Sequence, residues 1–235
     1  MILVELIIFD LDGTLVDTAF EVHQSINDTL QKMGLPQVSL ATSKRAIGPG
    51  PEEFVRILLP KNSLHRAGEF TALLSENYKR YNGVFADFFP GVPQILNQLN
   101  GKYKLAIATN KSLNEVMPLA EKLHFSKWFD AVFTRDHVKE PKPAPDLLLH
   151  ACRTLRVPTK RALMIGDTDN DILAARASGM FCCLAKWGYA SNQEELMKLC
   201  DCVADSPMDL QTLLNEFATV PEDYQLENSL KFSNR

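Results

Sequence analysis

The chain has few cysteines, and their arrangement excludes a disulfide-stabilised domain. Its 235 residues contain five, an odd set without regular spacing: Cys152, Cys182, Cys183, Cys200 and Cys202. Small secreted domains instead carry even, regularly spaced cysteines. The close pairs also lack the two-residue gap of zinc ligands and lie in short apolar runs, so we expect no zinc site. We therefore expect a protein of a reducing compartment, the cytoplasm.

The chain also lacks a long hydrophobic run and an excess of positive charge. No apolar stretch is long enough to cross a membrane, and the first residues have no basic start, while Glu5 and Asp10 interrupt their apolar run. We therefore expect neither a membrane span nor a signal peptide. The formal net charge of −4 and the absence of a basic run argue against nucleic acid as a partner. The apolar fraction of 46% is ordinary for a globular protein with a packed core.

The most informative stretch present is Phe-Asp-Leu-Asp-Gly-Thr-Leu at residues 9–15, which directly follows the apolar residues 4–8. An apolar run rich in β-branched residues is typical of a strand buried on both faces of a parallel sheet. Asp10 and Asp12 then fall at the carboxyl end of this strand, where open α/β sheets bind ligands.

This spacing suits phosphate ester chemistry. Two carboxylates can act on one bound group if a cation offsets their repulsion, and Mg²⁺ does so with oxygen ligands. Asp10 can attack phosphorus to form an aspartyl-phosphate, and Asp12 can donate a proton to the leaving alcohol. Gly13 lets the backbone turn, and Thr14 adds a hydroxyl. Two aspartates near a glycine also occur in ordinary solvated turns, so other strand ends must decide.

The rest of the chain divides into a helical segment and a segment in which strands and helices alternate. Apolar residues recur at helical spacing in residues 22–33, 52–59 and 67–81, and no strand is expected between residues 16 and 89. From residue 90 onward we expect strands at 105–108, 131–133, 162–165 and 181–185, with helices at 92–99, after 112, at 145–155, before Gly179, and after 191 and 206.

This order predicts an α/β fold with a Rossmann-like parallel sheet of about five strands and an inserted all-helical cap. The core is expected to comprise residues 1–15 and 90–217, and the cap residues 16–89. Both connections to the cap reach the edge that carries the aspartates, so a hinge there can open and close it. Residues 218–235 are polar and remain unassigned.

Three further strand ends carry residues that suit phosphoryl transfer. Thr109 and Asn110 follow the strand at 105–108 and can hold a phosphate oxygen. Lys142 stands between prolines, and its ammonium can offset the charge of Asp10 and of the phosphoryl group. Lys139 and Lys111 are nearby rivals for this role.

Asp167 and Asp171 follow the strand at 162–165, and we expect Asp167 to contact the metal directly. Asp171 acts through water or positions Lys142. Asp167 and its neighbours also share the first spacing of an EF-hand calcium loop. That alternative fails because Ile172 stands where glycine is needed and Ser178 where the bidentate glutamate belongs.

Together these four motifs resemble those of the haloacid dehalogenase superfamily, with residues 10–14, 109–110, 142 and 167–171 as the first to fourth. The resemblance implies a hydrolase with Asp10, Asp12 and Lys142 as catalytic residues. It also implies phosphate binding by Gly13, Thr14, Thr109 and Asn110. Mg²⁺ would be held by Asp10, the backbone carbonyl of Asp12, Asp167 and, through water, Asp171.

Within the superfamily the chain is most similar to phosphoglycolate phosphatases, by residues 17–19, 27–36, 47–50 and 89–92. A small phosphorylated metabolite is therefore the expected partner. Arg45, with Gly48 and Gly50, is the candidate for substrate binding in a cap loop, because an arginine suits a carboxylate.

Several alternatives remain open at this point. One is a phosphosugar mutase, whose branch usually carries a cap histidine where this chain has Val22. Others are a pyrophosphatase or nucleotide phosphatase of the same superfamily. A non-catalytic binding module would lack one of the acids, and none is missing. The sequence leaves the oligomeric state open between monomer and dimer.

Overall fold

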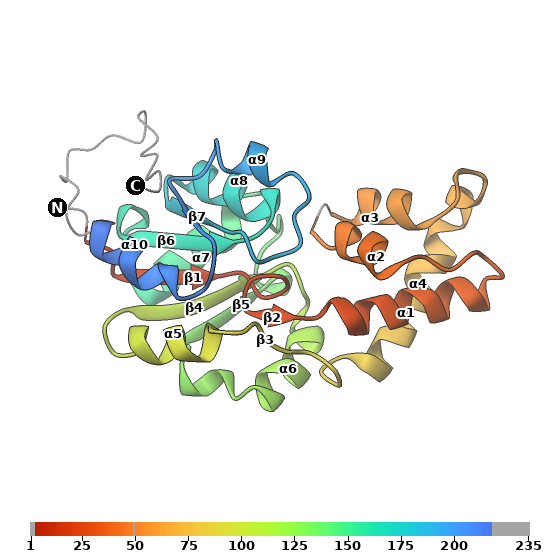
Figure 1. Cartoon of the computed structure of the whole chain (residues 1–235), viewed down its shortest axis with the longest axis horizontal. Coiled ribbons are helices and arrows are strands. Elements are labelled where there is room, and N and C mark those ends of the chain that lie inside the picture. Colours follow the sequence, from red (N-terminus) through yellow and green to blue (C-terminus); the bar gives the residue numbers. More distant parts are fainter. Residues whose placement is uncertain (1–2, 49, 218–235) are drawn as a thin grey trace.

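A computed structural model describes residues 3–48 and 50–217, and its centre is a six-stranded parallel sheet (Figure 1). The strands follow the order β5-β4-β1-β6-β7-β8. Their bounds are β1 Leu6–Phe9, β4 Lys104–Thr109, β5 Ala131–Thr134, β6 Ala162–Gly166, β7 Phe181–Ala185 and β8 Cys202–Ala204. The predicted α/β fold class is therefore confirmed.

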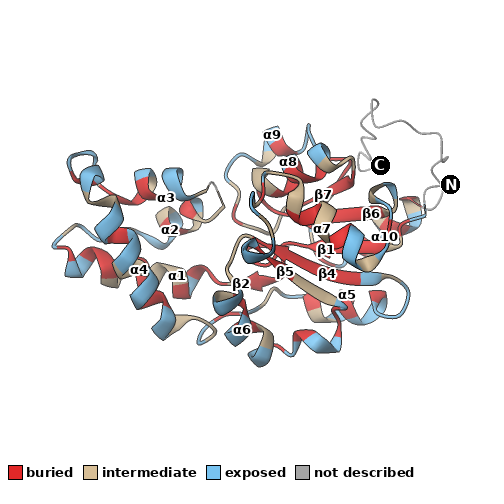
Figure 2. Ribbon diagram, turned by 180° about the vertical axis from the view of Figure 1, so that it is seen from behind, coloured by how far each residue is buried: buried red, intermediate tan, exposed pale blue. Residues whose placement is uncertain are grey.

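Each face of the sheet carries its own apolar layer, because side chains alternate along a strand. Ile7 and Phe9 belong to one buried cluster, whereas Leu6 and Ile8 belong to the other. The first face is covered by α5 (Val92–Leu99), α6 (Leu113–Lys122) and α10 (Asp209–Phe217), and the second by α7 (Asp146–Leu155), α8 (Asp169–Ser178) and α9 (Gln193–Leu196). Figure 2 shows the central strands as a buried layer between these helices.

The central strand β1 pairs in parallel with β4 on one side and β6 on the other. The three strands end within two residues of one another, since Phe9 lies opposite Ile107 and Ile165, while β4 ends at Thr109 and β6 at Gly166. Residues that directly follow these three strands must therefore meet at one edge of the sheet.

The insert is a bundle of helices beside this edge (Figure 1). It contains α1 (Ala19–Lys32), α2 (Leu40–Ala46), α3 (Pro51–Leu58), a 3₁₀ helix (Lys61–Arg66) and α4 (Ala67–Tyr81). It has its own apolar cluster, in which Ile26 and Leu30 of α1 pack with Phe70 of α4. We call it the cap.

The structure corrects the expectation that no strand occurs between residues 16 and 89. The strands β2 (Val16–Asp17) and β3 (Asp87–Phe88) pair antiparallel, so both connections to the cap form one ribbon, and the helical insert lies between these two strands. Strands of two residues are too short to produce an alternating pattern. The three-residue β8 escaped the sequence analysis for the same reason, and α2 was also missed. The proposed limits of core and cap remain a prediction, and residues 218–235 lie outside the described residues.

The helix expected after residue 112 begins with a capping box, since the Glu115 carboxylate accepts hydrogen bonds from the Ser112 backbone N–H (2.7 Å) and hydroxyl (2.6 Å). Short 3₁₀ turns occupy Phe125–Lys127, Arg135–His137 and Thr159–Arg161. Within the described parts of the chain, no helix combines the length and the apolar character that a membrane span requires. The five cysteines are buried free thiols.

Candidate active site

Three aspartates meet at the carboxyl edge of the sheet. Asp10 follows β1, Asp167 follows β6, and Asp171 lies in the first turn of α8. Each offers a carboxylate oxygen, and these oxygens lie within 4.8 Å of one another. All three residues are buried. The adjacency of β1 and β6 thus joins acids that are far apart in the sequence.

Burial raises the pKa of two of these acids, Asp10 and Asp167. Burial, and next the charge of Asp171, raises the pKa of Asp10 to about 7 although Lys142 lowers it. Burial likewise raises the pKa of Asp167 well above its usual value, with further contributions from the charges of Asp10 and Asp171. The site therefore has more negative charge than it can stabilise by itself.

Lys142 is the cation that contacts this cluster. Its Nζ donates to Asp10 Oδ1 (2.7 Å), to the Ala108 carbonyl (2.7 Å) and to Asp171 Oδ1 (2.5 Å), so each of its three protons has an acceptor. Burial alone would lower the pKa of Lys142, but Asp10 and Asp171 outweigh it and the pKa is raised. The other oxygen of Asp171 accepts from the Thr168 N–H and hydroxyl, which fixes this carboxylate.

The donor set around Asp167 fits a further cation. Asp167 Oδ1 accepts from the Thr14 hydroxyl (3.0 Å) and Oδ2 from the Tyr189 N–H (2.7 Å). Among residues 3–48 and 50–217, no cationic side chain forms an ion pair with Asp167. Three buried carboxylates thus share one ammonium, and an all-oxygen set of this kind is what Mg²⁺ prefers.

Glycines leave room for these carboxylates. A Cβ on Gly13 would lie 2.3 Å from Asp167 Oδ2, and a Cβ on Gly188 would lie 2.2 Å from the Asp167 Cβ. A Cβ on Gly166 would lie 2.3 Å from the Asp171 Cβ. Real Cβ atoms do not approach other atoms so closely, so the acids occupy space that only glycine leaves free.

Asp12 lies beside the cluster and has different partners. Its Oδ1 accepts from the Thr18 hydroxyl (2.5 Å) and lies 3.3 Å from Lys111 Nζ. Thr18 precedes the cap helix α1, whereas Lys111 follows β4 of the core. Asp12 is therefore the acid that faces the junction of cap and core.

The residues expected to bind phosphate differ in the hydrogen bonds that they already form within the protein. The Gly13 N–H donates to the Val16 carbonyl (3.1 Å), and the Thr14 hydroxyl donates to Asp167. The Asn110 amide donates to the Lys142 carbonyl (2.7 Å) and so holds the lysine loop. The buried Thr109 hydroxyl accepts from the Lys111 N–H (3.2 Å).

On the cap, the structure corrects the expected loop at Arg45. Residues 40–46 form α2, and Arg45 is exposed on it, whereas the half-buried Lys44 points its Nζ toward the Tyr189 ring of the core, 5.7 Å from the centroid. A seven-residue helix flanked by Ser39 and Ile47 is too short for a clear apolar period. Of the adjacent basic pair, Lys44 is the residue that faces the core.

Two glycines of the cap differ in their surroundings. A Cβ on Gly48 would lie 2.6 Å from Thr168 Cγ2, and the Gly48 carbonyl accepts from the Asn170 side chain. Gly50 precedes α3, and a Cβ there would meet nothing within 4 Å. Gly48 is therefore the point where the cap touches the loop that carries Asp167 and Asp171.

Sequence reasoning missed the segment after β7. The Tyr189 hydroxyl accepts from the backbone N–H groups of Thr18 (2.9 Å) and Ala19 (3.1 Å) and donates to Asp17 Oδ1 (2.6 Å). The Trp187 indole donates to the Thr14 carbonyl (2.8 Å). Since this segment directly follows a strand, the rule that selected the other strand ends would have found it.

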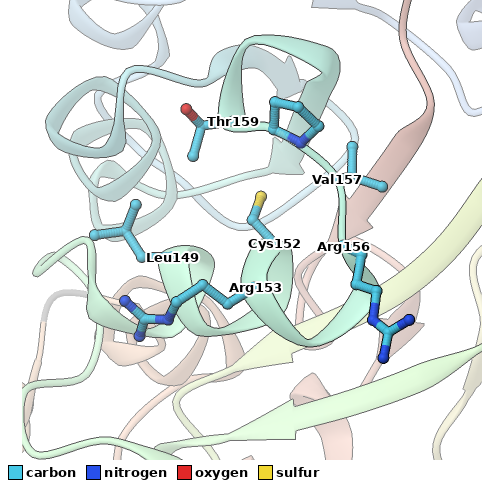
Figure 3. Close-up of a pocket in the computed structure, with 7 residues that line it drawn as sticks. Leu149, Cys152, Arg153, Arg156, Val157 and Thr159 are labelled. Atoms are coloured by element: carbon cyan, nitrogen blue, oxygen red, sulfur yellow. The ribbon is translucent and has the colours of Figure 1, made fainter.

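A hollow of about 380 Å³ lies elsewhere, at the C-terminal end of α7 (Figure 3). It is lined by Leu149, Cys152, Arg153, Arg156, Val157, Pro158 and Thr159. These residues precede β6, so the hollow lies at the opposite edge of the sheet from the acids. Burial raises the pKa of the Cys152 thiol to about 11, which disfavours the thiolate form.

The fold and the site define an α/β enzyme class in which buried acids stand at the carboxyl edge of a parallel sheet beside a helical insert. Residues 7–185, more than half of the chain, match the family of haloacid dehalogenase-like hydrolases, and the chain belongs to this family. Its expected membership is thereby confirmed.

Individual relatives cover nearly the whole chain. A phosphoglycolate phosphatase of Cupriavidus necator is 32% identical over 219 residues, which span 92% of this chain and 95% of the relative. A haloacid dehalogenase-like hydrolase from Streptococcus pneumoniae has a TM-score of 0.80 and 27% identity, covering 89% and 98% of the two chains. CbbY from Rhodobacter sphaeroides, solved with xylulose-1,5-bisphosphate, has a TM-score of 0.68 and 27% identity, covering 88% and 96%.

Proposed function

We propose that the protein is a Mg²⁺-dependent phosphomonoester hydrolase that acts on a small phosphorylated metabolite through an aspartyl-phosphate. The observation that carries this proposal is the contact between Lys142 Nζ and Asp10 Oδ1 within a cluster of three buried acids. An ammonium beside a carboxylate that ends a central strand orients that carboxylate and offsets the charge of an incoming phosphate.

In the proposed reaction, the Asp10 carboxylate attacks phosphorus while the ester oxygen leaves with a proton from Asp12. Asp12 then takes a proton from water, and the oxygen of that water attacks phosphorus, which releases phosphate and restores Asp10. Mg²⁺, held by Asp10, the Asp12 carbonyl, Asp167 and, through water, Asp171, would supply positive charge to the phosphoryl oxygens.

Among the expected phosphate ligands, Thr109 is the strongest candidate. Its hydroxyl oxygen accepts from a backbone N–H, and no acceptor for its proton is found among the described residues. Gly13 and Thr14 already donate within the protein. We propose that Asn110 acts mainly by holding Lys142 in place, because its amide donates to the Lys142 carbonyl.

We propose a substrate with a second anionic group, of which phosphoglycolate is the first to test. The Cupriavidus necator relative is named a phosphoglycolate phosphatase, and CbbY was solved with a ligand that carries two phosphates. Lys44 supports this class, because it is a cation that reaches from the cap toward the core, where its Nζ lies over the Tyr189 ring. Such a cation can bind a carboxylate when a substrate is present.

The test of the reaction is Asp10→Asn, which should keep the fold but leave less than about a hundredth of the turnover, because no other group can replace a covalent nucleophile. Rapid-quench labelling of the parent with a radioactive phosphoester should trap a phosphoprotein that resists acid and is cleaved by hydroxylamine. An Asn variant with near-parental turnover would exclude Asp10 as the nucleophile.

A phosphosugar mutase is the second candidate, favoured by the sugar bisphosphate in the CbbY structure. Against it, Val22 occupies the position of the mutase histidine, and the neighbouring His23 is used inside the cap, where its Nδ1 lies 2.9 Å from Ser43 Oγ. Activity that depends on an added bisphosphate, without net phosphate release, would favour the mutase. Phosphate release across a panel of small esters, pyrophosphate and nucleotides separates the remaining hydrolases.

A further inference from the structure

A chain of polar contacts, half-buried at Asp12 and Lys111 and buried at Tyr78 and Glu21, runs from Asp12 to the base of the cap. Lys111 Nζ lies 3.3 Å from Asp12 Oδ1 and donates to the Tyr78 hydroxyl at 2.7 Å. The Tyr78 hydroxyl donates in turn to Glu21 Oε1 at 3.2 Å. The first two residues belong to the core, and the last two belong to α4 and α1 of the cap.

The far end of this chain joins the two connections of the cap. Glu21 lies in the first turn of α1, just after the first connection, and is fully buried. Its Oε2 accepts from the backbone N–H groups of Gly83 (3.1 Å) and Ala86 (3.2 Å), which lead into the second connection. Glu21 therefore ties both connections to Tyr78.

The charges of the chain depend on Lys111. Burial raises the pKa of Glu21, and Lys111 is the nearby cation that lowers it. Burial alone would lower the pKa of Lys111, but Asp12, Tyr78 and Glu115 outweigh it and the pKa is raised. Lys111 therefore stays charged. It pairs directly with the Asp12 carboxylate of the core and, through the Tyr78 hydroxyl, interacts with the Glu21 carboxylate of the cap. Removing one of these residues would leave a charged group of the chain without its partner.

We propose that Lys111 and Tyr78 are positioning residues that couple closure of the cap to the placement of Asp12. This inference rests on the proposed function, in which Asp12 gives a proton to the leaving alcohol. Tyr78 moves with the cap and Lys111 stays with the core, so their hydrogen bond exists only when the base of the cap lies against the sheet edge. When it exists, it holds Lys111 beside Asp12, and Asp12 is then confined to the orientation that serves a substrate enclosed by the cap.

The decisive variant is Tyr78→Phe, which removes the hydroxyl and keeps the ring that packs against Lys111 Nζ, 4.6 Å from its centroid. The matched control is Tyr81→Phe on the same helix, which removes a hydroxyl that donates to Asp28 (2.8 Å) away from Asp12. Two substrates without a second anionic group, ethyl phosphate and p-nitrophenyl phosphate, are compared, because only the ethanol leaving group needs a proton.

We expect Tyr78→Phe to lower kcat for ethyl phosphate about tenfold with little change in KM, since it loses a hydrogen bond to a charged group that positions Asp12. For p-nitrophenyl phosphate the loss should stay below about twofold. Tyr81→Phe should match the parent on both esters. Equal behaviour of the two variants, or equal losses on both esters, would overturn the proposal.

A second variant, Lys111→Met, tests the same chain from the core side. It should show the same dependence on the leaving group, and the double variant with Tyr78→Phe should lose no more than Lys111→Met alone, because both changes break one chain. Additive losses would overturn the coupling. Thermal unfolding of each variant is measured in parallel, and a lowered Tm with unchanged turnover per folded molecule would assign Tyr78 a structural role only.

These outcomes are distinct from failure of the proposed function. If the parent releases no phosphate from either ester, or if Asp10→Asn stays active, the hydrolase assignment itself is wrong. If the parent is active and Asp10→Asn is inactive, the comparison of Tyr78→Phe with Tyr81→Phe decides the coupling alone.

Discussion

Asp167 is fixed by two hydrogen bonds and by the close approach of two glycines. Thr14 and the Tyr189 N–H each donate to one of its oxygens, and Gly13 and Gly188 approach it from two sides. Gly13 has a φ of +85°, in the left-handed region that favours glycine. Its lack of a side chain therefore serves both the turn and the space of the neighbouring acid.

These two roles of Gly13 can be separated by comparison with Gly101, whose φ is +79° and where an added Cβ would meet nothing within 4 Å. Gly101→Ala should lose about 1 kcal/mol of unfolding free energy, because alanine is strained in this region, and Gly13→Ala should lose more, because its methyl also clashes with Asp167. Gly13→Ala should also lower turnover about a hundredfold, since its methyl displaces Asp167.

Urea unfolding and phosphate release at a series of Mg²⁺ concentrations measure the two effects. Gly101→Ala should keep the parental Mg²⁺ requirement. Parental turnover in Gly13→Ala would mean that Asp167 can move without consequence.

The short helix α2 gives two adjacent basic residues different surroundings. Successive residues of an α-helix are about 100° apart around its axis, so neighbours cannot share a face. Lys44 therefore points toward Tyr189 of the core while Arg45 is exposed to solvent. In a loop, which the sequence analysis expected here, either residue could have reached the substrate.

Lys44→Ala and Arg45→Ala form a matched pair on this helix. Lys44→Ala should lower kcat/KM for phosphoglycolate about ten- to a hundredfold, the value of a charged hydrogen bond, and should barely affect p-nitrophenyl phosphate. Arg45→Ala should change neither. The reverse result, with Arg45→Ala selective for phosphoglycolate, would return the role to Arg45, and equal losses on both substrates in Lys44→Ala would indicate an effect on closure of the cap.

The stability of the whole molecule depends on pH through the buried acids of the site. Asp10 and Asp167 are buried beside each other, and burial raises the pKa of both. In the metal-free folded protein, the pKa of Asp10 is raised from 3.8 to about 7, so between these values the folded state binds more protons than the unfolded one. Stability of the metal-free protein must therefore fall as the pH rises through this range and stay lower above it.

In the proposed site Mg²⁺ would take the place of the proton on these carboxylates, so it should stabilise the protein more at high pH than at low pH. We expect the rise in Tm on adding Mg²⁺ in place of chelator to be larger at about pH 8 than at about pH 5. Differential scanning calorimetry in both buffers measures it. In Asp10→Asn the metal-free Tm should depend less on pH, and an equal Mg²⁺ effect at both pH values in the parent would contradict the linkage.

Much of the fold could be predicted because it depends on local pattern. The runs that became β1, β4, β6 and β7 were apolar enough to indicate buried strands, and the order of strands and helices implied a parallel sheet. Asp10, Asp167 and Lys142 could be selected because each directly follows a strand or precedes a helix. Elements of two or three residues, β2, β3 and β8, could not be predicted, since no period can be read from so short a run.

The sequence by itself determined which chemical groups stand at the carboxyl edge of the sheet, because strand order and chain direction place them there. Only the tertiary structure decided which partners those groups have. The Tyr189 hydroxyl meets the Thr18 N–H across 171 residues, and Lys111 meets Tyr78 across 33. Such contacts arise from the packing of the cap on the core, which no local sequence pattern encodes. For the same reason, which of Lys44 and Arg45 faces the core depended on the orientation of α2.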